Sequence, residues 1–581
     1  MRLLNHHYRD TAELDAFCRA QAVEDSPQLL IQVFCGNLED HFIRELNAAL
    51  RQRFPQATIL GTTTGGEIAD GELFEEGVIV SFLQFEKTRL AGVVQAWDNP
   101  DSFALGQQLA RQIDNRDEPP ALIIAVATGL NTNGEDFVLG VSDVLPGVPL
   151  AGGLAGEYLR FNHTWIFDGD TILTQGAMAV ALYNPGLQVQ TLYSMDWMPL
   201  GRALTVNRAR RNLLIELDGR PAIDTYRHYL SDEAAEFIPV LSVQFPLMVE
   251  RGGMKLARGC TGVNDDGSMV FMGNFRPGDK VWFAIGDANA LLDSSSELIQ
   301  RLRNHHYEAI LCYTCVARKA LMTKLIGDEA RVFQQIAPTA GFFTYGEFFH
   351  ANDTNLFFNY TLTLVALTEH PDRPVDERPL PLSLSTARVT TETQAYAYLI
   401  NRTARELEEL LDQMHELART DELTRLPNRR YLMEQIRGHV RLRDRDDVPL
   451  SLLLLDLDDF KRVNDRYGHQ AGDEVLVDLA RIIENVVRLS DIPGRWGGEE
   501  FLIICPNTDL HGACDLAGRL RKAVAGHRFG NDLKLTLSIG CAEHREGEAA
   551  DHLIGRADRS LYAAKDAGKN RVCGCDAIGE A

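Results

Sequence analysis

Two adjacent glycines near the C-terminal end, Gly497 and Gly498, restrict the fold more than any other feature of this sequence. They join the short apolar runs 492–496 and 501–505 within the stretch RWGGEEF. Glycine tolerates the positive φ angles of tight turns, so the stretch predicts a β-hairpin. Glu499 and Glu500 follow the bend, and adjacent carboxylates repel each other unless a cation or a substrate proton lies nearby. A solvated turn is the alternative to a functional site.

Composition indicates a globular protein of several domains. The chain has 581 residues, of which 45% are hydrophobic and 24% charged, enough for three or four domains with buried cores. Its formal charge of −24 argues against a surface for duplex nucleic acid or an anionic membrane, because both need a basic face. A phosphate-bearing ligand would therefore have to come with metal ions.

Cysteine usage and the N-terminal residues indicate the compartment. The ten cysteines are scattered without a framework spacing, which fits a reduced cytoplasm. The start, MRLLNHHYRD, has no apolar core of a signal peptide, and no run of about 18 apolar residues occurs. We expect a cytoplasmic protein that neither enters a membrane nor binds nucleic acid.

The N-terminal third reads as an α/β segment. Short apolar runs at 29–34, 78–83, 121–127 and 178–183 predict strands of a large mixed sheet. Apolar residues spaced as on a helix lie between the first two runs: Phe42, Ile43, Leu46, Ala49 and Leu50. Two glycine clusters, at 61–67 and 151–157, lack the lysine of a P-loop and the G-x-G-x-x-G spacing. They either present backbone N–H groups to a small ligand's carboxylate or form tight turns in a crowded sheet.

A second segment, from about residue 213 to 367, ends in the loop GFFTYGE at 341–347 and an alternating strand at 359–365. On the stretches GTTTGGEI, GGLAGE, CVAR and TYGE, the two segments together resemble the N- and C-terminal parts of the FIST sensory domain. The resemblance implies sensing of a small ligand, with amino acids the usual suggestion and haem in some members. It names no ligand.

Three residues of this region are candidates for a metal-binding or redox role. Cys312 and Cys315 have suitable spacing, but no second pair completes a zinc site, and their apolar surroundings favour a buried strand. His350 is a candidate axial ligand for haem, with an ordinary structural histidine as the alternative.

A proline-rich stretch after His370 predicts a linker. Beyond it a heptad pattern predicts a helix that pairs in a parallel homodimer, with packing against its own domain as the alternative. The pattern consists of Ile400, Ala404, Leu407, Leu411, Met414 and Ala418.

The C-terminal segment begins DELTRLPNRR at Asp421 and alternates strands with amphipathic helices. With RWGGEEF and the other motifs in order, it resembles the GGDEF domain of diguanylate cyclases. Arg425 departs from the family pattern, which usually has glycine there, in a turn near the entry helix.

The apolar run 452–455 predicts a central strand that delivers Asp456 to the sheet rim, where α/β proteins bind ligands. Beside the hairpin, Asp456, Glu499 and Glu500 would need divalent cations between them, and oxygen ligands select Mg²⁺ or Mn²⁺. The resemblance implies two ions per site, with Leu457 also a ligand. Without these neighbours Asp456 could be only a helix cap.

By the same resemblance Asn464 and Asp473 bind guanine. A carboxylate accepts the N1–H and N2–H of guanine, whereas adenine would leave Asp473 unpaired, so we expect GTP rather than ATP. A helix N-cap is the other interpretation of Asp473. The triphosphate is assigned to Lys461, to backbone N–H groups around Asp459 and Phe460, and to Lys565 and Lys569, whose spacing predicts one shared helix face. The family usually has arginine at the last position, and lysine loses its bidentate fork.

The implied reaction condenses two GTP molecules into cyclic di-GMP and two pyrophosphates, with Glu499 as proton acceptor. Each domain offers one GTP site, so two must face each other, and the dimerising helix would bring them together. Arg488 and Asp491 match the family's R-x-x-D product-inhibition site, with a helix-end salt bridge as the alternative; Arg519 is a further candidate contact.

We therefore predict a multidomain α/β and α+β protein: a large mixed-sheet sensor, a coiled-coil helix and a ferredoxin-like, cyclase-like domain whose partly antiparallel sheet is flanked by helices. A non-enzymatic cyclic di-GMP receptor and a haem-based gas sensor that drives the same cyclase are the alternatives. The expected boundaries are an extension at 1–26, FIST parts at 27–212 and 213–368, a linker at 369–387, the helix at 388–420, the GGDEF domain at 421–575 and a tail at 576–581.

Overall fold

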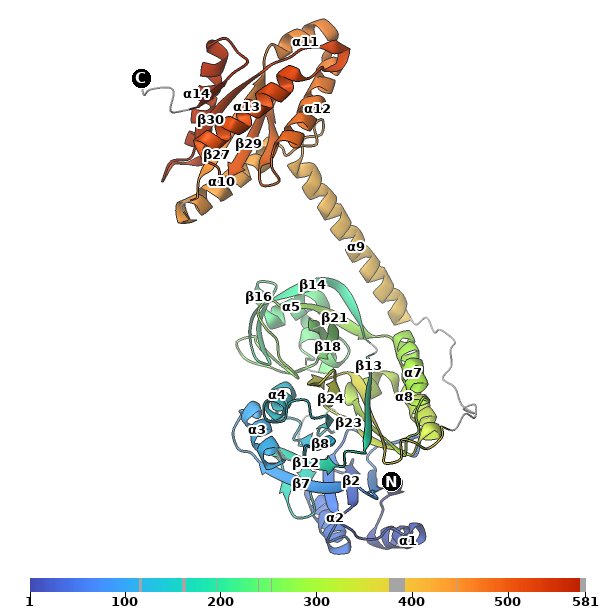
Figure 1. Cartoon of the computed structure of the whole chain (residues 1–581). Coiled ribbons are helices and arrows are strands. Elements are labelled where there is room, and N and C mark those ends of the chain that lie inside the picture. The colour runs from blue at the N-terminus through green and yellow to red at the C-terminus, as the bar shows by residue number, and fades with distance from the viewer. Residues whose placement is uncertain are drawn as a thin grey trace. The chain divides into compact units, whose positions relative to one another are not determined.

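The structure is a computed structural model that describes residues 1–113, 118–158, 163–195, 197–238, 240–251, 253–375, 392–446 and 448–574. The chain divides into two compact units, an N-terminal unit Met1–Ala404 and a C-terminal unit Arg405–Ala581. Figure 1 labels several elements of each unit. Residues 376–391, which include most of the expected linker and the first four residues of the expected helix, lie outside the described residues, as does the expected tail.

The first sheet of the N-terminal unit has six strands, with the central pair parallel. Helix α2 (Asp40–Arg53) connects this pair and buries Ile43, Leu46 and Leu50, as its apolar spacing indicates. The segment expected to be an extension forms β1 and α1 (Thr11–Gln21), and β1 pairs antiparallel with β6 along its length. In sheet order the strands are β1 (Arg2–His7), β6 (Val78–Gln84), β2 (Leu29–Cys35), β3 (Thr58–Thr63), β10 (Ile166–Phe167) and β11 (Ile172–Leu173).

The second and third sheets each combine strands from both halves of the N-terminal unit. In order, the second consists of β25 (Thr354–Phe358), β24 (Glu347–Ala351), β9 (Leu150–Leu154), β8 (Leu122–Ala127), β12 (Gly176–Tyr183) and β7 (Arg89–Ala96). The third consists of β13 (Gln188–Met195), β26 (Thr361–Thr368), β22 (Ala309–Cys315), β23 (Thr339–Thr344), β4 (Glu67–Ala69) and β5 (Glu72–Phe74). The four apolar runs predicted for one large sheet thus belong to two sheets, because runs of similar pattern do not specify their pairing partners.

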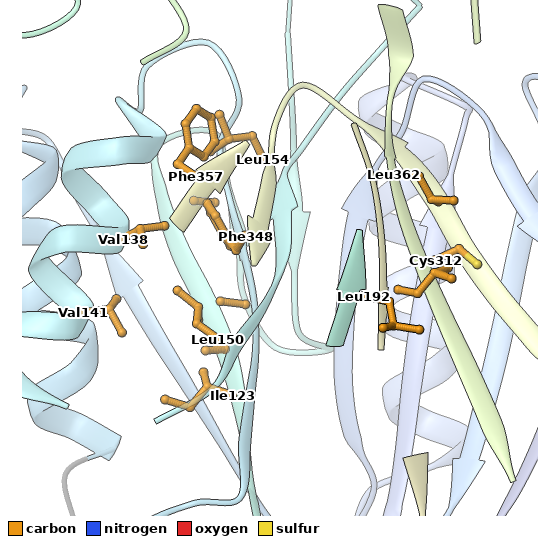
Figure 2. Close-up of a cluster of buried hydrophobic side chains, with 14 of the residues drawn as sticks. Ile123, Val138, Val141, Leu150, Leu154, Leu192, Cys312, Phe348, Phe357 and Leu362 are labelled. Carbon is orange, nitrogen blue, oxygen red and sulfur yellow. The ribbon is translucent and has the colours of Figure 1, made fainter. Parts of the chain in front are cut away.

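Helices cover these sheets. Figure 1 shows α3 (Ser102–Ile113) beside α4 (Gly134–Val144), and α7 (Ala288–Leu302) beside α8 (Val316–Ile336). Figure 2 shows part of the core between the elements: Val138 and Val141 of α4 point toward Ile123 and Leu150, while Leu192, Cys312 and Leu362 form a neighbouring group. Side chains far apart in the sequence therefore share one core.

Three parallel strand pairs organise this interleaving. The pairs β2–β3, β8–β9 and β22–β23 are each followed by a turn that ends in Gly-Glu, at Glu67, Glu157 and Glu347. All three glutamates are fully buried. Backbone hydrogen bonds join the turns: Gly65 N–H to Phe343 O, Gly156 N–H to Thr63 O and Leu154 N–H to Gly346 O, at 2.9, 3.0 and 2.8 Å. The two halves of the unit consequently share a single framework.

The fourth sheet has eight strands, all of them between residues 197 and 286. Helices α5 (Ala222–Leu230) and α6 (Asp232–Ala235) accompany it. Its main path is β18 (Met254–Arg258), β17 (Leu247–Arg251), β21 (Lys280–Gly286), β14 (Trp197–Arg210), β15 (Leu213–Leu217), β20 (Met269–Phe271) and β19 (Cys260–Val263), and β16 (Arg220–Pro221) pairs with β15.

The C-terminal unit is a five-stranded sheet between two helical layers. In order its strands are β28 (Ile492–Gly497), β29 (Glu500–Pro506), β27 (Leu450–Leu457), β30 (Leu537–Glu543) and β31 (Val572–Gly574). Alternate β27 residues face opposite sides: Leu453 and Leu455 pack toward α12 (His469–Val486) and α13 (Leu510–Gly526), whereas Leu452 and Leu454 pack toward α10 (Arg429–Asp446) and α14 (Ala550–Asp566). Strand pairs are antiparallel except β30–β31, so the predicted fold class is confirmed.

The long helix α9 (Glu392–Arg419) occupies the position of the predicted coiled coil. Ile400 and Leu407 of its heptad pattern are 45% and 59% exposed, so their side chains are available to a partner helix. The side chains of Leu411, Met414 and Ala418 lie outside the described part. In the described portion of the chain, no helix combines the length and apolar character required to cross a bilayer.

Candidate active site

The hairpin and the central strand of the C-terminal unit bring carboxylates together. β27 and β29 are antiparallel, and their register places Asp456 directly opposite Glu500. Gly498 has φ +52° at the bend, a conformation that glycine adopts without strain, and Glu499 lies in the turn between the two strands. Both glutamates are half-buried, whereas Asp456 is only 6% exposed.

Burial and mutual repulsion disfavour ionisation of Asp456 and Glu500. Burial raises the pKa of Asp456, to which Glu499 and Asp458 add, while Lys565 opposes the shift. Burial, followed by the charge of Asp456, likewise raises the pKa of Glu500. Lys565 Nζ lies 2.7 Å from Asp456 Oδ2, so a lysine ammonium provides the cation at this point.

The chemistry of the donor set fits Mg²⁺ or Mn²⁺. Asp456, Glu499 and Glu500 supply only oxygen ligands, and the charge repulsion that contributes to the raised pKa of Asp456 and of Glu500 is one that a divalent cation would relieve. Among the described residues, no three such side chains already converge closely enough to hold an ion. A metal ion that bound Asp456 would meet Lys565 at this carboxylate, because the ammonium already contacts Oδ2.

An ion pair that the sequence analysis missed stabilises the hairpin. Arg495 donates to Gly498 O from Nε and Nη2, at 3.0 and 2.9 Å, and its Nη1 lies 3.1 Å from Asp421 Oδ1. Asp421 also accepts from the hydroxyl and backbone N–H of Thr424. Burial opposes ionisation of Asp421, but the Thr424 and Arg495 contacts outweigh it and lower its pKa. The opening motif thus supports the bend. The sequence signal for this contact was Arg495, the arginine of the stretch RWGGEEF.

The same opening motif explains the departure at Arg425. This residue has φ +62°, the left-handed conformation that glycine adopts at low cost. Arginine is therefore somewhat strained in this turn.

The phosphate-binding residues expected from the sequence lie on two elements. Asp459, with φ +61°, precedes helix α11 (Phe460–Tyr467), and Lys461 is exposed in its first turn. Lys569 Nζ lies 2.7 Å from Asp459 Oδ1. Two basic side chains, Lys565 and Lys569, thus reach opposite ends of the segment 456–459.

The prediction that Lys565 and Lys569 share a helix face is wrong. Helix α14 ends at Asp566, and the next residues turn back, with Gly568 at φ +111° and Lys569 at φ +62°. The N–H groups of Gly568 and Lys569 donate to Lys565 O and Ala564 O, a glycine-based helix ending. Spacing alone could not reveal where the helix stopped.

Asn464 and Asp473 lie on consecutive helices, α11 and α12. Asn464 is half-buried beside Gly472, where a Cβ would collide with the Asn464 side chain. The interpretation of Asp473 as an N-cap is wrong, because α12 begins at His469 with Gly468 as its cap. Asp473 is exposed one turn into the helix, so capping does not explain a carboxylate there.

The R-x-x-D residues form a turn that ends in a buried carboxylate. Asp491 is 7% exposed, and its Oδ2 accepts the backbone N–H of Arg488 at 2.8 Å. The Arg488 side chain is exposed, and among the ion pairs of the described residues none joins it to Asp491. The helix-end salt bridge is therefore not formed. Arg519 is exposed on α13.

Comparison with protein families matches these observations. Residues 418–571 match the model described as diguanylate cyclase, GGDEF domain, and residues 29–220 and 222–350 match the FIST N and FIST C domains. The chain is a FIST–GGDEF fusion. The GGDEF domain carries the carboxylate pair, and the FIST region contains the interleaved sheets.

Relatives of known name match a part of the fusion. The response regulator PleD of Caulobacter vibrioides is 41% identical over 208 residues, which cover 35% of this chain and 44% of PleD. The diguanylate cyclase DgcM of Escherichia coli is 43% identical over 169 residues, 29% of this chain and 41% of DgcM. The chain thus spans less than half the length of these relatives.

A solved structure of the coiled coil and GGDEF domain of DgcB from Caulobacter crescentus, in complex with c-di-GMP, is 29% identical. The match covers 32% of this chain and 100% of that chain, with a TM-score of 0.31.

The FIST region contains a cavity of about 410 Å³ at the carboxyl ends of the parallel strands β2 and β3. Its lining combines the loop before α2, the first glycine turn and an aromatic side chain: Gly36, Asn37, Leu38, Glu39, Thr64, Gly65, Gly66, Glu76 and Tyr158. Lys319, with a 2% exposed side chain, lies beneath it and donates to Gly65 O at 3.1 Å. The first glycine cluster therefore lines a cavity. Its residue types alone had left open whether it faces a ligand or only forms a tight turn.

The other candidate residues of the FIST region lie in strands of its sheets. Cys312 and Cys315 lie in β22, and burial raises the pKa of both thiols far above the usual range. His350 Nδ1 on β24 lies 2.8 Å from Asn355 Oδ1 of β25. His350 is not among the residues that line this cavity.

Proposed function

We propose that the fusion is a diguanylate cyclase that condenses two GTP molecules into cyclic di-GMP and two pyrophosphates. The observation that carries the proposal is the pairing of Asp456 with Glu500 beside Glu499 and Lys565, on a domain of the GGDEF family. Curated relatives named as diguanylate cyclases share 42% and 43% identity with this part of the chain. Oxygen ligands and an adjacent cation are the groups that phosphoryl transfer requires.

In this proposal the residues of the domain have separate roles in binding and catalysis. Asn464 and Asp473 bind guanine, and the exposed Asp473 carboxylate accepts the N1–H and N2–H groups. Lys461, Lys565, Lys569 and the N–H groups around Asp459 and Phe460 bind the triphosphate. Glu499, on the turn, accepts the proton of the attacking 3′-hydroxyl.

Asp456, Glu499, Glu500 and the Leu457 carbonyl would hold Mg²⁺ or Mn²⁺, proposed as two per site. Such ions neutralise charge that develops on the phosphates and lower the pKa of a bound hydroxyl. Lys565 exchanges its contact with Asp456 for phosphate oxygens when substrate binds.

Each domain supplies one GTP site, so the reaction needs two domains face to face. We propose that α9 pairs with α9 of a second copy through the side of the helix that carries Ile400 and Leu407. Leu407→Glu places a charge in that seam. Dimers should then dissociate in sedimentation and activity per domain should fall at low protein concentration, while Leu442→Glu, at an exposed position of α10, leaves both unchanged. A fully active monomer would exclude this role of α9.

Product inhibition is proposed at Arg488 and Asp491, with Arg519 as a further contact. The exposed Arg488 guanidinium is available to a phosphate, and the buried Asp491 carboxylate holds the turn that presents it. Both contacts serve equally in a non-enzymatic receptor, which would have no use for the carboxylates at the hairpin.

The FIST region is proposed to sense a small molecule in the cavity at the ends of β2 and β3 and to act on the cyclase through α9. Asn401 of α9 supports the coupling, because its amide accepts from Gly201 N–H at 2.8 Å and donates to Pro199 O at 3.0 Å. A movement of strand β14 would thus be transmitted directly to the helix.

Ligand screening tests the sensor. Compounds that raise the unfolding temperature of the full chain should lose this effect in Asn37→Phe, which fills the cavity, and retain it in Gln52→Phe, at an exposed position near the other end of α2. Equal shifts in both variants would place the ligand elsewhere. A Soret absorption band in the purified protein would instead support haem.

Purified protein incubated with GTP and Mg²⁺ tests the enzymatic proposal. The expected products are pyrophosphate and cyclic di-GMP in a ratio of two to one. Tight binding of cyclic di-GMP without pyrophosphate release, in the presence of every ligand that stabilises the FIST region, would establish the receptor instead.

A further inference from the structure

Asp458 is a buried carboxylate next to the proposed site, with no role in the scheme above. It follows the last residue of β27 and is 5% exposed. Its Oδ1 accepts from Ser538 Oγ at 2.6 Å, and its Oδ2 accepts from Thr536 Oγ1 at 2.6 Å and from Asn570 N–H at 3.0 Å. One carboxylate thus connects β27, the start of β30 and the segment after α14.

The segment bound by Asp458 has an unfavourable backbone. Gly568, Lys569 and Asn570 have φ of +111°, +62° and +46°, three left-handed residues in succession, of which only the first is glycine. Such a conformation persists only when surrounding contacts enforce it, and strained residues cluster at ligand-binding sites. The end of α14 binds the first two N–H groups, and Asp458 binds the third.

The backbone conformation of this segment sets the direction in which the Lys569 side chain points. This side chain leaves the strained segment toward the N-terminus of α11, where Nζ meets Asp459 Oδ1 at 2.7 Å. Without the Asp458 contact, the backbone at Asn570 would be free to relax toward negative φ, and the preceding lysine would turn with it. Asn570 is also held by Arg521, through Nη1 to Oδ1 at 3.0 Å, but this contact is exposed.

We infer that Asp458 is a positioning residue, which holds the segment 568–570 so that Lys569 presents its ammonium to the triphosphate of the nucleotide. The inference rests on the proposed function of the GGDEF domain. It adds a residue that determines affinity for the triphosphate and touches no substrate atom itself. A purely structural Asp458 would instead affect only the stability of the domain.

Nucleotide binding by the full chain tests the inference independently of turnover. Guanosine 5′-(α,β-methylene)triphosphate cannot lose pyrophosphate, so its dissociation constant with Mg²⁺ can be measured at equilibrium. In Asp458→Asn this constant should rise about tenfold, the scale of a lost contact to a charged group. The affinity for guanosine, which has no phosphates, should stay unchanged.

A double-mutant cycle shows whether Asp458 acts through Lys569. Lys569→Ala alone should weaken binding of the analogue, and adding Asp458→Asn should change it no further, since the positioned side chain is already absent. Independent, multiplying losses would overturn the inference, as would equal weakening of guanosine and the analogue. Failure of the wild-type chain to bind the analogue would count against the proposed function itself.

Glu548→Gln provides a matched control. Glu548 is also a largely buried carboxylate of this domain, bound by Arg556 Nε at 2.8 Å, near the end of β30 remote from Ser538. The unfolding temperature of this variant should be lower than that of the wild type, and its dissociation constant for the analogue should be unchanged. If Asp458→Asn does not fold, Thr536→Val, which removes one hydroxyl donor to the same oxygen, should raise the constant about threefold, a part of one hydrogen bond. That effect too must vanish in the Lys569→Ala background, or the inference fails.

Discussion

Asp456 lies directly opposite Glu500 across the antiparallel strands β27 and β29, and Lys565 Nζ is 2.7 Å from the Asp456 carboxylate. The site therefore contains a cation of its own before any metal or nucleotide binds. This pairing explains how two carboxylates can be close together in the free protein. A divalent cation that bound this carboxylate would compete with Lys565.

Because of this competition, we expect Lys565→Ala to strengthen the binding of metal and to weaken the binding of nucleotide. Without the ammonium, Mn²⁺ should bind the free protein about three- to tenfold more tightly, the scale of one nearby charge in a partly solvated site. The Michaelis constant for GTP should rise, because a phosphate contact is lost. Titration of Mn²⁺ by electron paramagnetic resonance measures the first effect. Lys569→Ala, whose ammonium pairs with Asp459, should not tighten Mn²⁺ binding.

Glu499→Ala should reduce cyclic di-GMP formation by about 10²- to 10⁴-fold, the usual contribution of a positioned proton acceptor. The fold should remain intact, because Glu499 is half-buried on a turn. Chromatography of the products and thermal unfolding check the two statements. Glu546→Ala, in an exposed loop of the same domain, is the control. Unchanged turnover in Glu499→Ala would assign proton transfer to another group.

Arg488→Ala should weaken inhibition by cyclic di-GMP about 10- to 100-fold, since contacts between a guanidinium and phosphate are lost. Its unfolding temperature should stay constant because the side chain is exposed. Asp491→Ala should both relieve inhibition and destabilise the domain, because Asp491 holds the backbone of the turn. Undiminished inhibition in Arg488→Ala would place the inhibitory site elsewhere.

The buried glutamates predict that the FIST region loses stability as pH rises. Burial raises the pKa of Glu67 and of Glu347 to about 8, although hydrogen bonds from threonine hydroxyls oppose the shift. Between pH 4.5, the ordinary value, and about 8, the folded state binds more protons than the unfolded state. The free energy of unfolding is therefore highest below pH 4.5. Above that pH it falls by up to about 1.4 kcal/mol per pH unit for each carboxyl.

Urea unfolding of the full chain at several pH values measures this effect. Tryptophan fluorescence reports mainly on the FIST region, which holds Trp97, Trp165, Trp197 and Trp282, against Trp496 in the GGDEF domain. Glu347→Gln removes one titration and should flatten the profile. An equally steep loss of stability in this variant would mean that Glu347 does not titrate in this range.

Local features of the chain were predictable because they depend on neighbours in the sequence. The apolar run before Asp456, the Gly497-Gly498 bend and the amphipathic spacing of α2 each correspond to an element of the structure. Hydrophobic periodicity and the conformational freedom of glycine act over a few residues. The sequence therefore determined the α/β character of the two units and the position of the acidic hairpin.

Contacts between distant segments were decided by tertiary structure alone. The sequence did not indicate that β24 would pair with β9 or that β1 would join β6, because strands of similar composition are interchangeable until a common core selects their partners. For the same reason, the end of α14 before Lys569 and the contact of Asp458 with Asn570 appear only in the folded chain. Local sequence specifies which element forms, whereas pairing and burial over long distances decide what each side chain meets.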